Sequence, residues 1–294
     1  MSFILGYTGG TLDRADHLRR DAQAIQMARM HPSARWLVLD DLKPVLTEDG
    51  SDLLWARRGE LEGEGLSIFL GLETDGSPRF ASDCAIGDLP GVATDARAAG
   101  MRLADGRGAL IAQARSVLDW HRRHGFCAVC GTPTHPEKAG YSRVCPGCGA
   151  EHFPRVDPVV IMLALKDDMA LVGRGPGFPP RFMSALAGFV EPGECLEEAV
   201  ARELHEEVGL RVGNVRYLAS QPWPFPSSLM MAAYADADGF VLTLDAQEIE
   251  EARWVNREEC AAALRGEAEW QAPPAFAIAH TLLANWVAEG ERTR

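Results

Sequence analysis

Two closely spaced cysteine pairs constrain the fold of this 294-residue chain more than any other feature. Cys127 and Cys130 form the first pair, Cys145 and Cys148 form the second, and fourteen residues separate the pairs. A glycine follows each pair and lets backbone N–H groups turn towards the thiolate sulfurs. Four thiolates at this spacing predict a closed tetrahedral site for structural zinc, built as a zinc ribbon.

Other uses of these cysteines fit the pattern less well. A redox pair would not need the second pair, and four thiolates leave no open position for the water of a catalytic zinc. The chain has seven cysteines, of which four form the two tight pairs and three, Cys84, Cys195 and Cys260, are scattered. In a reducing compartment this odd count and uneven spacing favour metal binding over disulfides. Zinc ribbons often contact nucleic acid, but the few basic residues near this one favour a scaffold role.

The composition indicates a globular protein with a strongly acidic surface. Hydrophobic residues make up 47% of the chain, which is ample for packed cores in two or more domains. The longest strongly apolar stretch, residues 159–165, is far shorter than the roughly 20 residues of a membrane span. No secretory signal is visible at the N-terminus, so we expect a cytoplasmic protein. The net charge of −13 repels nucleic acid and membranes in general, so a polyphosphate ligand needs local cations.

Three domains are expected along the chain, and no internal repeat is visible. Residues 1–118 mix short apolar stretches with turns and end in predicted helices, which indicates an N-terminal α+β domain of unknown role. Residues 119–155 form the zinc ribbon. Residues 156–294 open with a predicted hairpin and continue with a glutamate-rich helix, further strands and a final helix. The fold class is therefore α/β, with an α/β sandwich after the zinc ribbon.

The glutamate-rich helix lies in the segment 188–210, which holds seven glutamates between positions 191 and 207. Good helix formers predict a helix from residue 193 to residue 208. Gly209 stands where a left-handed stop is expected.

Three of these glutamates share one face of the predicted helix. At about 100° per residue, Glu203, Glu206 and Glu207 continue the stripe that is apolar one and two turns earlier. Acids that only solubilise lie on the opposite face, as Glu198 and His205 do. Carboxylates turned inwards repel one another and lose hydration unless a cation compensates, and hard oxygen ligands select Mg²⁺ or Mn²⁺. On spacing alone, a solvated charged face is the alternative.

The segment as a whole resembles a complete Nudix box, the signature of hydrolases that cleave a nucleoside diphosphate linked to another moiety. The matching pattern is Gly188-x5-Glu194-x7-Arg202-Glu203-Leu204-x-Glu206-Glu207-x-Gly209-Leu210. The resemblance implies an α/β/α sandwich in which the box forms loop, helix and loop. It implies catalytic metal ligands at Glu203, Glu206, Glu207, Glu248 and the carbonyl of Ala187. Arg202, beside these ligands, is expected to hold a carboxylate through a bidentate pair.

A second motif, "SQPWPFPSS", spans residues 220–228. Its three prolines predict an extended backbone, so that Trp223 and Phe225 project on the same side. Such a pair can stack on a flat ring, which is worth about 1 to 3 kcal/mol per base. The alternative is a packing patch on an edge strand.

This string resembles the motif of the NADH pyrophosphatase branch of the Nudix family, which also places a four-cysteine zinc ribbon before the Nudix domain. The resemblance covers residues 120–294, and residues 1–118 only as a variable N-terminal domain. Some members carry tyrosine where Phe153 stands, so a stacking role is kept and a phenolic hydrogen bond is lost. The implied substrate-binding residues are Phe153, Gln221, Pro222, Trp223, Pro224, Phe225, Pro226, Ser227, Ser228 and Ala279.

The resemblance implies a homodimeric enzyme that hydrolyses the diphosphate bond of NADH or NAD⁺ to NMN(H) and AMP. Mg²⁺ or Mn²⁺ would activate a water, with Glu203, Glu206 and Arg202 in the catalytic site and Glu207 orienting or deprotonating that water. Two other enzymatic readings are removal of an NAD cap from RNA 5′ ends and a broader substrate such as ADP-ribose. A non-catalytic binding or regulatory protein is the reading from a different class, and the intact metal acids speak against it.

Overall fold

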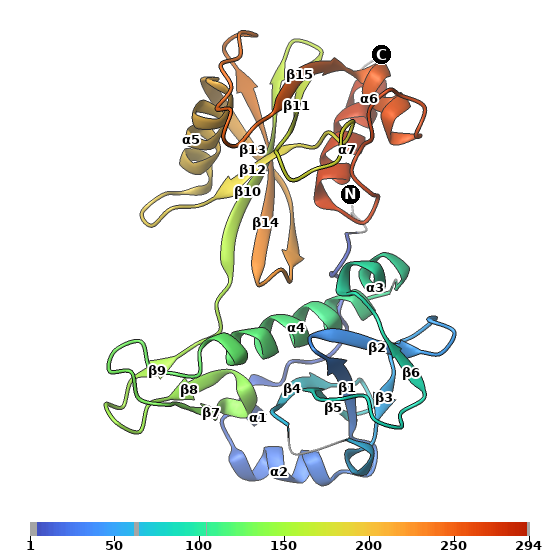
Figure 1. Cartoon of the computed structure of the whole chain (residues 1–294), viewed down its shortest axis with the longest axis vertical. Helices are drawn as coiled ribbons and strands as arrows, with labels where there is room; N and C mark the ends of the chain where they lie inside the picture. The colour runs from blue at the N-terminus through green and yellow to red at the C-terminus, as the bar shows by residue number, and fades with distance from the viewer. Residues whose placement is uncertain (1–4, 62–64, 104, 293–294) are drawn as a thin grey trace. The chain divides into compact units, whose positions relative to one another are not determined.

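The computed structural model describes residues 5–61, 65–103 and 105–292 (Figure 1). The chain divides into two compact units. The C-terminal unit comprises Met1–Leu5, Asp157–Gln221 and Ser228–Arg294, and the N-terminal unit comprises Gly6–Val156 and Pro222–Ser227. The predicted boundaries at residues 118 and 155 stay predictions. Within the described residues, no helix is both long and apolar enough to cross a membrane.

The C-terminal unit is built on one mixed, six-stranded sheet of order β13-β14-β10-β11-β15, with β12 paired to β10. Its long central strand β10 runs parallel to β14 and antiparallel to β11 and β12. The predicted hairpin is confirmed, because β10 and β11 join through a turn at Asp167. The strands are β10 (Asp157–Lys166), β11 (Met169–Arg174), β12 (Leu186–Phe189), β13 (Val212–Trp223), β14 (Ser228–Ala237) and β15 (Glu251–Asn256).

Helices cover both faces of this sheet (Figure 1). Alternate side chains of β10 enter different cores, as expected of a strand that is buried on both sides. Val160 and Met162 pack in the core that α5 (Leu196–Val208) covers. Ile161 and Leu163 pack in the core under α6 (Arg257–Leu264) and α7 (Ile278–Arg292). The predicted α/β/α sandwich is therefore confirmed.

Helix α5 begins later than its composition suggested. The prediction that it opens at Gly193 is wrong, because this glycine has φ of 101°, which no right-handed helix accommodates. Cys195 is the N-cap residue, and its N–H donates to the Glu198 carboxylate at 2.8 Å. The predicted end is confirmed, since Val208 is the last helical residue and Gly209 has φ of 73°.

The N-terminal unit repeats the strand order of the C-terminal unit. Its sheet runs β4-β5-β1-β2-β6 with β3 paired to β1, and the central strand β1 is parallel to β5 and antiparallel to β2 and β3. The strands are β1 (Arg35–Asp40), β2 (Lys43–Thr47), β3 (Trp55–Ala56), β4 (Ser67–Leu72), β5 (Pro78–Asp83) and β6 (Gly91–Ala93). The α-helices are α1 (Asp16–Arg19), α2 (Ala22–Met30), α3 (Ala96–Arg102) and α4 (Arg107–Arg123).

The cysteine pairs lie in loops beside a three-stranded antiparallel sheet that follows α4, with the first pair before β7 and the second between β8 and β9. Its strands are β7 (His135–Glu137), β8 (Ser142–Val144) and β9 (Glu151–His152), in the order β7-β8-β9. Strands this short cannot form an independent core, and a metal held by the four cysteines would add to the stability of the ribbon.

Candidate metal and substrate site

The four cysteines converge on one point. Their sulfurs all lie within 4.8 Å of one another. Cys127 and Cys148 are 3.6 Å apart, and Cys130 and Cys145 are 3.4 Å apart. A tetrahedral zinc with Zn–S bonds of about 2.3 Å requires sulfurs about 3.8 Å apart, so the cluster fits zinc closely. The predicted four-cysteine zinc-ribbon site is confirmed.

A second candidate metal site lies on α5. Glu203 and Glu207 are buried on the face that packs against the sheet, as predicted. Glu206 departs from the prediction, since 57% of its side chain is exposed. Glu198 and His205 lie exposed on the opposite face, as predicted. Two of the three acids are therefore turned inwards, and the third lies at the rim.

Glu207 is in the environment that most needs a cation. Its Oε2 is buried without a hydrogen-bond partner. Burial raises the pKa of Glu207 to about 8, and the charges of Glu203, Glu248 and Glu206 act in the same direction. Burial also raises the pKa of Glu203. A buried carboxylate oxygen with no partner, close to other carboxylates, is stabilised when a hard divalent cation binds there.

Strand β12 approaches Glu203 so closely that only glycine fits at position 188. A Cβ on Gly188 would lie 1.9 Å from the Glu203 carboxyl carbon. Gly188 pairs with Val160 of the central strand β10, so the backbone at this point cannot easily retreat. The preceding residue, Ala187, is exposed on the same strand, where its carbonyl is proposed as a further metal ligand.

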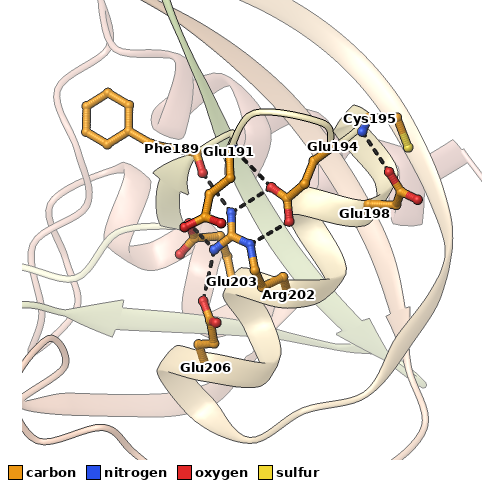
Figure 2. Close-up of polar contacts among 8 residues, drawn as sticks. All are labelled: Phe189, Glu191, Glu194, Cys195, Glu198, Arg202, Glu203 and Glu206. Carbon is orange, nitrogen blue, oxygen red and sulfur yellow. Dashed lines mark hydrogen bonds and ion pairs between the residues drawn. The ribbon is translucent and has the colours of Figure 1, made fainter.

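Arg202 binds several carboxylates at once (Figure 2). Its Nε and Nη2 donate to the two oxygens of Glu194 at 2.6 and 2.9 Å, which is the expected bidentate pair. Its Nη1 donates to Glu203 and to Glu206, both at 2.9 Å. The Arg202 guanidinium holds the pKa of Glu194 down to about 2. Arg202 therefore fixes the orientation of two proposed metal ligands and offsets part of their mutual repulsion.

Glu248 lies exposed in the segment before β15. Its charge raises the pKa values of Glu203 and Glu207, so it lies near both. Among the residues that the structure describes, only the four cysteines form a group whose ligand atoms all lie within 4.8 Å.

The proline-rich motif forms a turn between neighbouring strands, and the prediction of an extended backbone is wrong beyond Trp223. Strand β13 ends at Trp223, residues 224–227 form a turn, and β14 begins at Ser228. We call residues 222–227 the aromatic turn. The rings of Trp223 and Phe225 meet edge to face, with centroids 5.4 Å apart and planes at 66°. They therefore pack on each other and do not form a flat double platform.

The remaining predicted substrate residues differ in exposure. Gln221 is fully buried, and its amide bonds the Phe276 carbonyl and the Ile278 N–H, both at 2.8 Å, which anchors β13 to the start of α7. Ala279 is 5% exposed and packs in the same core. Phe153 is 57% exposed, and the Lys138 ammonium lies 5.2 Å from its ring centroid. Ser227 and Ser228 are buried, and Pro226 is exposed.

Comparison with protein families matches three successive parts of the chain. The NUDIX domain family matches residues 154–276, and the NADH pyrophosphatase zinc ribbon domain matches residues 122–153. The NADH pyrophosphatase-like rudimentary NUDIX domain matches residues 33–120. This chain belongs to the NADH pyrophosphatase branch of the Nudix hydrolases.

Known Nudix hydrolases of this branch align with nearly the whole chain. NAD-capped RNA hydrolase NudC of Mycobacterium bovis is 40% identical over 292 residues, which cover 94% of this chain and 92% of that protein. NAD-capped RNA hydrolase NUDT12 of Macaca fascicularis is 35% identical over 331 residues, which cover 94% of this chain and 72% of that protein.

One aromatic side chain of this Nudix site was not singled out from the sequence. Phe189 directly follows Gly188, and its carbonyl accepts a 2.8 Å hydrogen bond from Arg202 Nη2. Its ring is 60% exposed and points away from Arg202 in Figure 2. An aromatic residue next to the glycine that admits Glu203 is the signal that could have identified it.

Proposed function

We propose that this Nudix hydrolase cleaves the diphosphate bond of NADH or NAD⁺ and releases NMN(H) and AMP. The observation that carries the proposal is the buried oxygen of Glu207 that has no hydrogen-bond partner. The neighbouring Glu203 carboxyl group packs against Gly188 so closely that position 188 has no room for a side chain. Carboxylates arranged in this way suit a divalent cation, and a diphosphate needs a cation in a chain of net charge −13. The catalytic ion of the proposal is Mg²⁺ or Mn²⁺.

The residues of the site have distinct roles in this proposal. Glu203, Glu206, Glu207, Glu248 and the Ala187 carbonyl would hold the ion, which when bound offsets diphosphate charge and acidifies a water. Arg202 keeps Glu203 and Glu206 oriented. Glu207 accepts the proton of the attacking water, since the nearby cation keeps its carboxylate ionised.

Aromatic side chains are the groups proposed to bind the rings of the dinucleotide. Trp223 and Phe225 are half-buried, so each offers part of its ring to the substrate. Phe189 and Phe153 are exposed aromatic residues that a nicotinamide or adenine ring can stack on. The attack forms a new P–O bond from water and breaks the bridging P–O bond, so each product keeps one phosphate.

The test is chromatographic analysis of NADH incubated with the protein, with and without added Mg²⁺ or Mn²⁺. NMNH and AMP should form in equal amounts only with metal. Glu207→Gln keeps the size of the side chain and removes its basicity, and it should lower kcat by at least about 100-fold. Glu197→Gln, on the exposed first turn of the same helix, is the matched control and should keep wild-type activity.

Two outcomes would contradict the proposal. A Glu207→Gln variant with most of the wild-type rate would remove the role given to Glu207. Failure of the wild-type protein to form AMP with either metal would overturn the activity itself and favour a binding or regulatory role. The homodimer belongs to the same proposal, and light scattering of the purified protein checks it.

The names of the relatives favour a second candidate, removal of the NAD cap from RNA. Both the bacterial and the primate relative are named NAD-capped RNA hydrolases. The bond and the site are the same as for free NAD⁺. Comparing kcat/KM for NAD⁺, NADH, NAD-capped RNA and ADP-ribose ranks the two candidates and the broader substrate class.

A further inference from the structure

The aromatic turn belongs by its contacts to the N-terminal unit, although the residues on either side of it belong to the C-terminal unit. Three segments of the N-terminal unit contact this turn: the stretch at Tyr7, helix α3 and helix α4. The part of the chain without an assigned role therefore touches the motif that marks the substrate class.

Tyr7 supports both aromatic rings of the turn. Its ring meets Trp223 and Phe225 edge-on, with centroids 6.0 and 6.2 Å away. The Tyr7 hydroxyl donates to the Ala96 carbonyl at 2.9 Å, which ties the ring to the start of α3. Gly100 of α3 leaves room for the ring, since a Cβ there would lie 2.7 Å from it. The Tyr7 ring is therefore held in place by α3 and packs against both aromatic rings of the turn.

Two arginines hold the ring of Phe225. The guanidinium carbon of Arg97, on α3, lies 4.2 Å from the ring centroid, and that of Arg115, on α4, lies 4.7 Å away. A guanidinium within about 6 Å of an aromatic centroid is attracted to the ring. Arg97 is exposed, so its side chain can be removed without disturbing the core.

Helix α4 also binds the backbone of the turn. Arg115 Nη1 donates to the Pro224 carbonyl, and Ser116 Oγ donates to the Pro226 carbonyl at 3.3 Å. Prolines have no N–H, so these carbonyls are the polar groups that the turn offers at those positions. Adjacent residues of one helix thus bind carbonyls two residues apart, which fixes the path of the backbone.

We propose that the N-terminal unit acts on the substrate by holding the aromatic turn in one conformation, with Arg115 as the main positioning residue. The inference rests on the proposed function and assigns a role to a part of the chain that carries no metal acids. A preformed ring surface lowers the ordering cost of binding the dinucleotide. The reacting diphosphate is served by α5, so disturbing the turn should raise KM and leave kcat nearly unchanged.

The test compares Arg115→Ala, Arg115→Lys and the control Arg123→Ala, which removes an exposed α4 arginine that pairs with the buried Asp119. Arg115→Ala should raise KM for NADH about tenfold, because it loses both ring attraction and a hydrogen bond, with kcat within about twofold of wild type. Arg115→Lys keeps a donor but loses the planar guanidinium, so its KM should be intermediate. Amide hydrogen exchange should quicken at Trp223, Phe225 and Ser227 in Arg115→Ala only.

A KM for Arg115→Ala equal to that of Arg123→Ala would overturn the inference, and so would a fall in kcat with unchanged KM. If Arg115→Ala does not fold, Arg97→Ala takes its place, because it removes an exposed guanidinium from the rings of Phe225 and Trp223. An unchanged KM in Arg97→Ala would then overturn the inference. Normal turnover in these variants leaves the proposed function intact. Absence of turnover in the wild-type protein defeats the proposed function, while hydrogen exchange in Arg115→Ala still tests the positioning.

Discussion

Burial of Glu207 should make the stability of the metal-free protein depend on pH. Its pKa is raised from 4.5 to about 8 by burial, so the folded state binds a proton that the unfolded state has already released. The stability from this proton is fully present below about pH 4.5 and is lost as the pH rises through about 8. Without added divalent metal, Tm should therefore fall more steeply between pH 5 and 8 for wild type than for Glu207→Gln.

Calorimetry of both proteins across this pH range makes the measurement. All other titrating groups are shared, so the difference between the two curves belongs to Glu207. Added Mn²⁺ should flatten the wild-type curve, because a bound cation favours the carboxylate. Parallel curves in the absence of metal would show that Glu207 is solvated.

A substitution at Gly188 tests the site by steric overlap alone. In Gly188→Ala the new methyl group would overlap the Glu203 carboxyl group, which must then move away from β12. A displacement of about 1 Å at a catalytic group costs about 100-fold in rate, so kcat for NADH should fall by about that factor. Gly213→Ala, on β13 with no atom within 4 Å of the new Cβ, is the control and should be nearly silent. Equal kcat values for the two variants would contradict the close packing of Glu203.

At the scale of single elements, the sequence predicts which face of α5 is functional but not how deeply each residue is buried. Periodicity placed Glu203, Glu206 and Glu207 on one face, and the structure buries the first and third. Glu206 lies at the edge of that face, where it forms an ion pair with Arg202 and stays exposed. Angular position follows from helix geometry, whereas depth depends on the neighbouring strands, which the helix sequence does not contain.

The aromatic turn shows the same limit for a strand. Prolines fix their own φ and made an extended path reasonable, but a chain that connects neighbouring strands must reverse within a few residues. The partners of Phe225, namely Tyr7, Arg97 and Arg115, lie more than 100 residues earlier in the chain. No local pattern in residues 220–228 indicates such contacts. The aromatic character of the motif was therefore predictable from the sequence, but the residues that pack against it were not.

At the scale of the whole molecule, the chain contains two sheets of the same topology. Each has a parallel central pair, flanking antiparallel strands, a short extra strand on the central one, and two helices after the last strand. The sequence shows no repeat because topology needs only compatible burial patterns, which many different residues satisfy. Between β3 and β4 the N-terminal unit has only residues 57–66, where the C-terminal unit has a 13-residue α5 between β12 and β13. In the described part of this connection, residues 57–61 and 65–66, Arg58–Glu60 form a 3₁₀ turn and no α-helix is present.

The net charge of the whole chain predicts how hydrolysis of NAD-capped RNA responds to salt. The charge is −13, and the basic residues Arg107, Arg122 and Arg123 of α4 each pair with aspartate. An RNA body should therefore be repelled at low salt, whereas free NAD⁺ is small and only weakly affected. Raising NaCl from about 20 to about 200 mM shortens the screening length from about 20 to about 7 Å.

The kcat/KM for NAD-capped RNA, divided by that for free NAD⁺, should accordingly rise over this salt range at fixed Mn²⁺. The division cancels any effect of salt on the metal site, which both substrates share. In a protein whose cationic groove binds RNA phosphates, this ratio falls as salt is added. Binding there releases counterions from the RNA, and that release is less favourable at high salt. A ratio that falls steeply with salt would therefore mean that RNA is gripped along its backbone, and that the acidic surface is interrupted by a basic path.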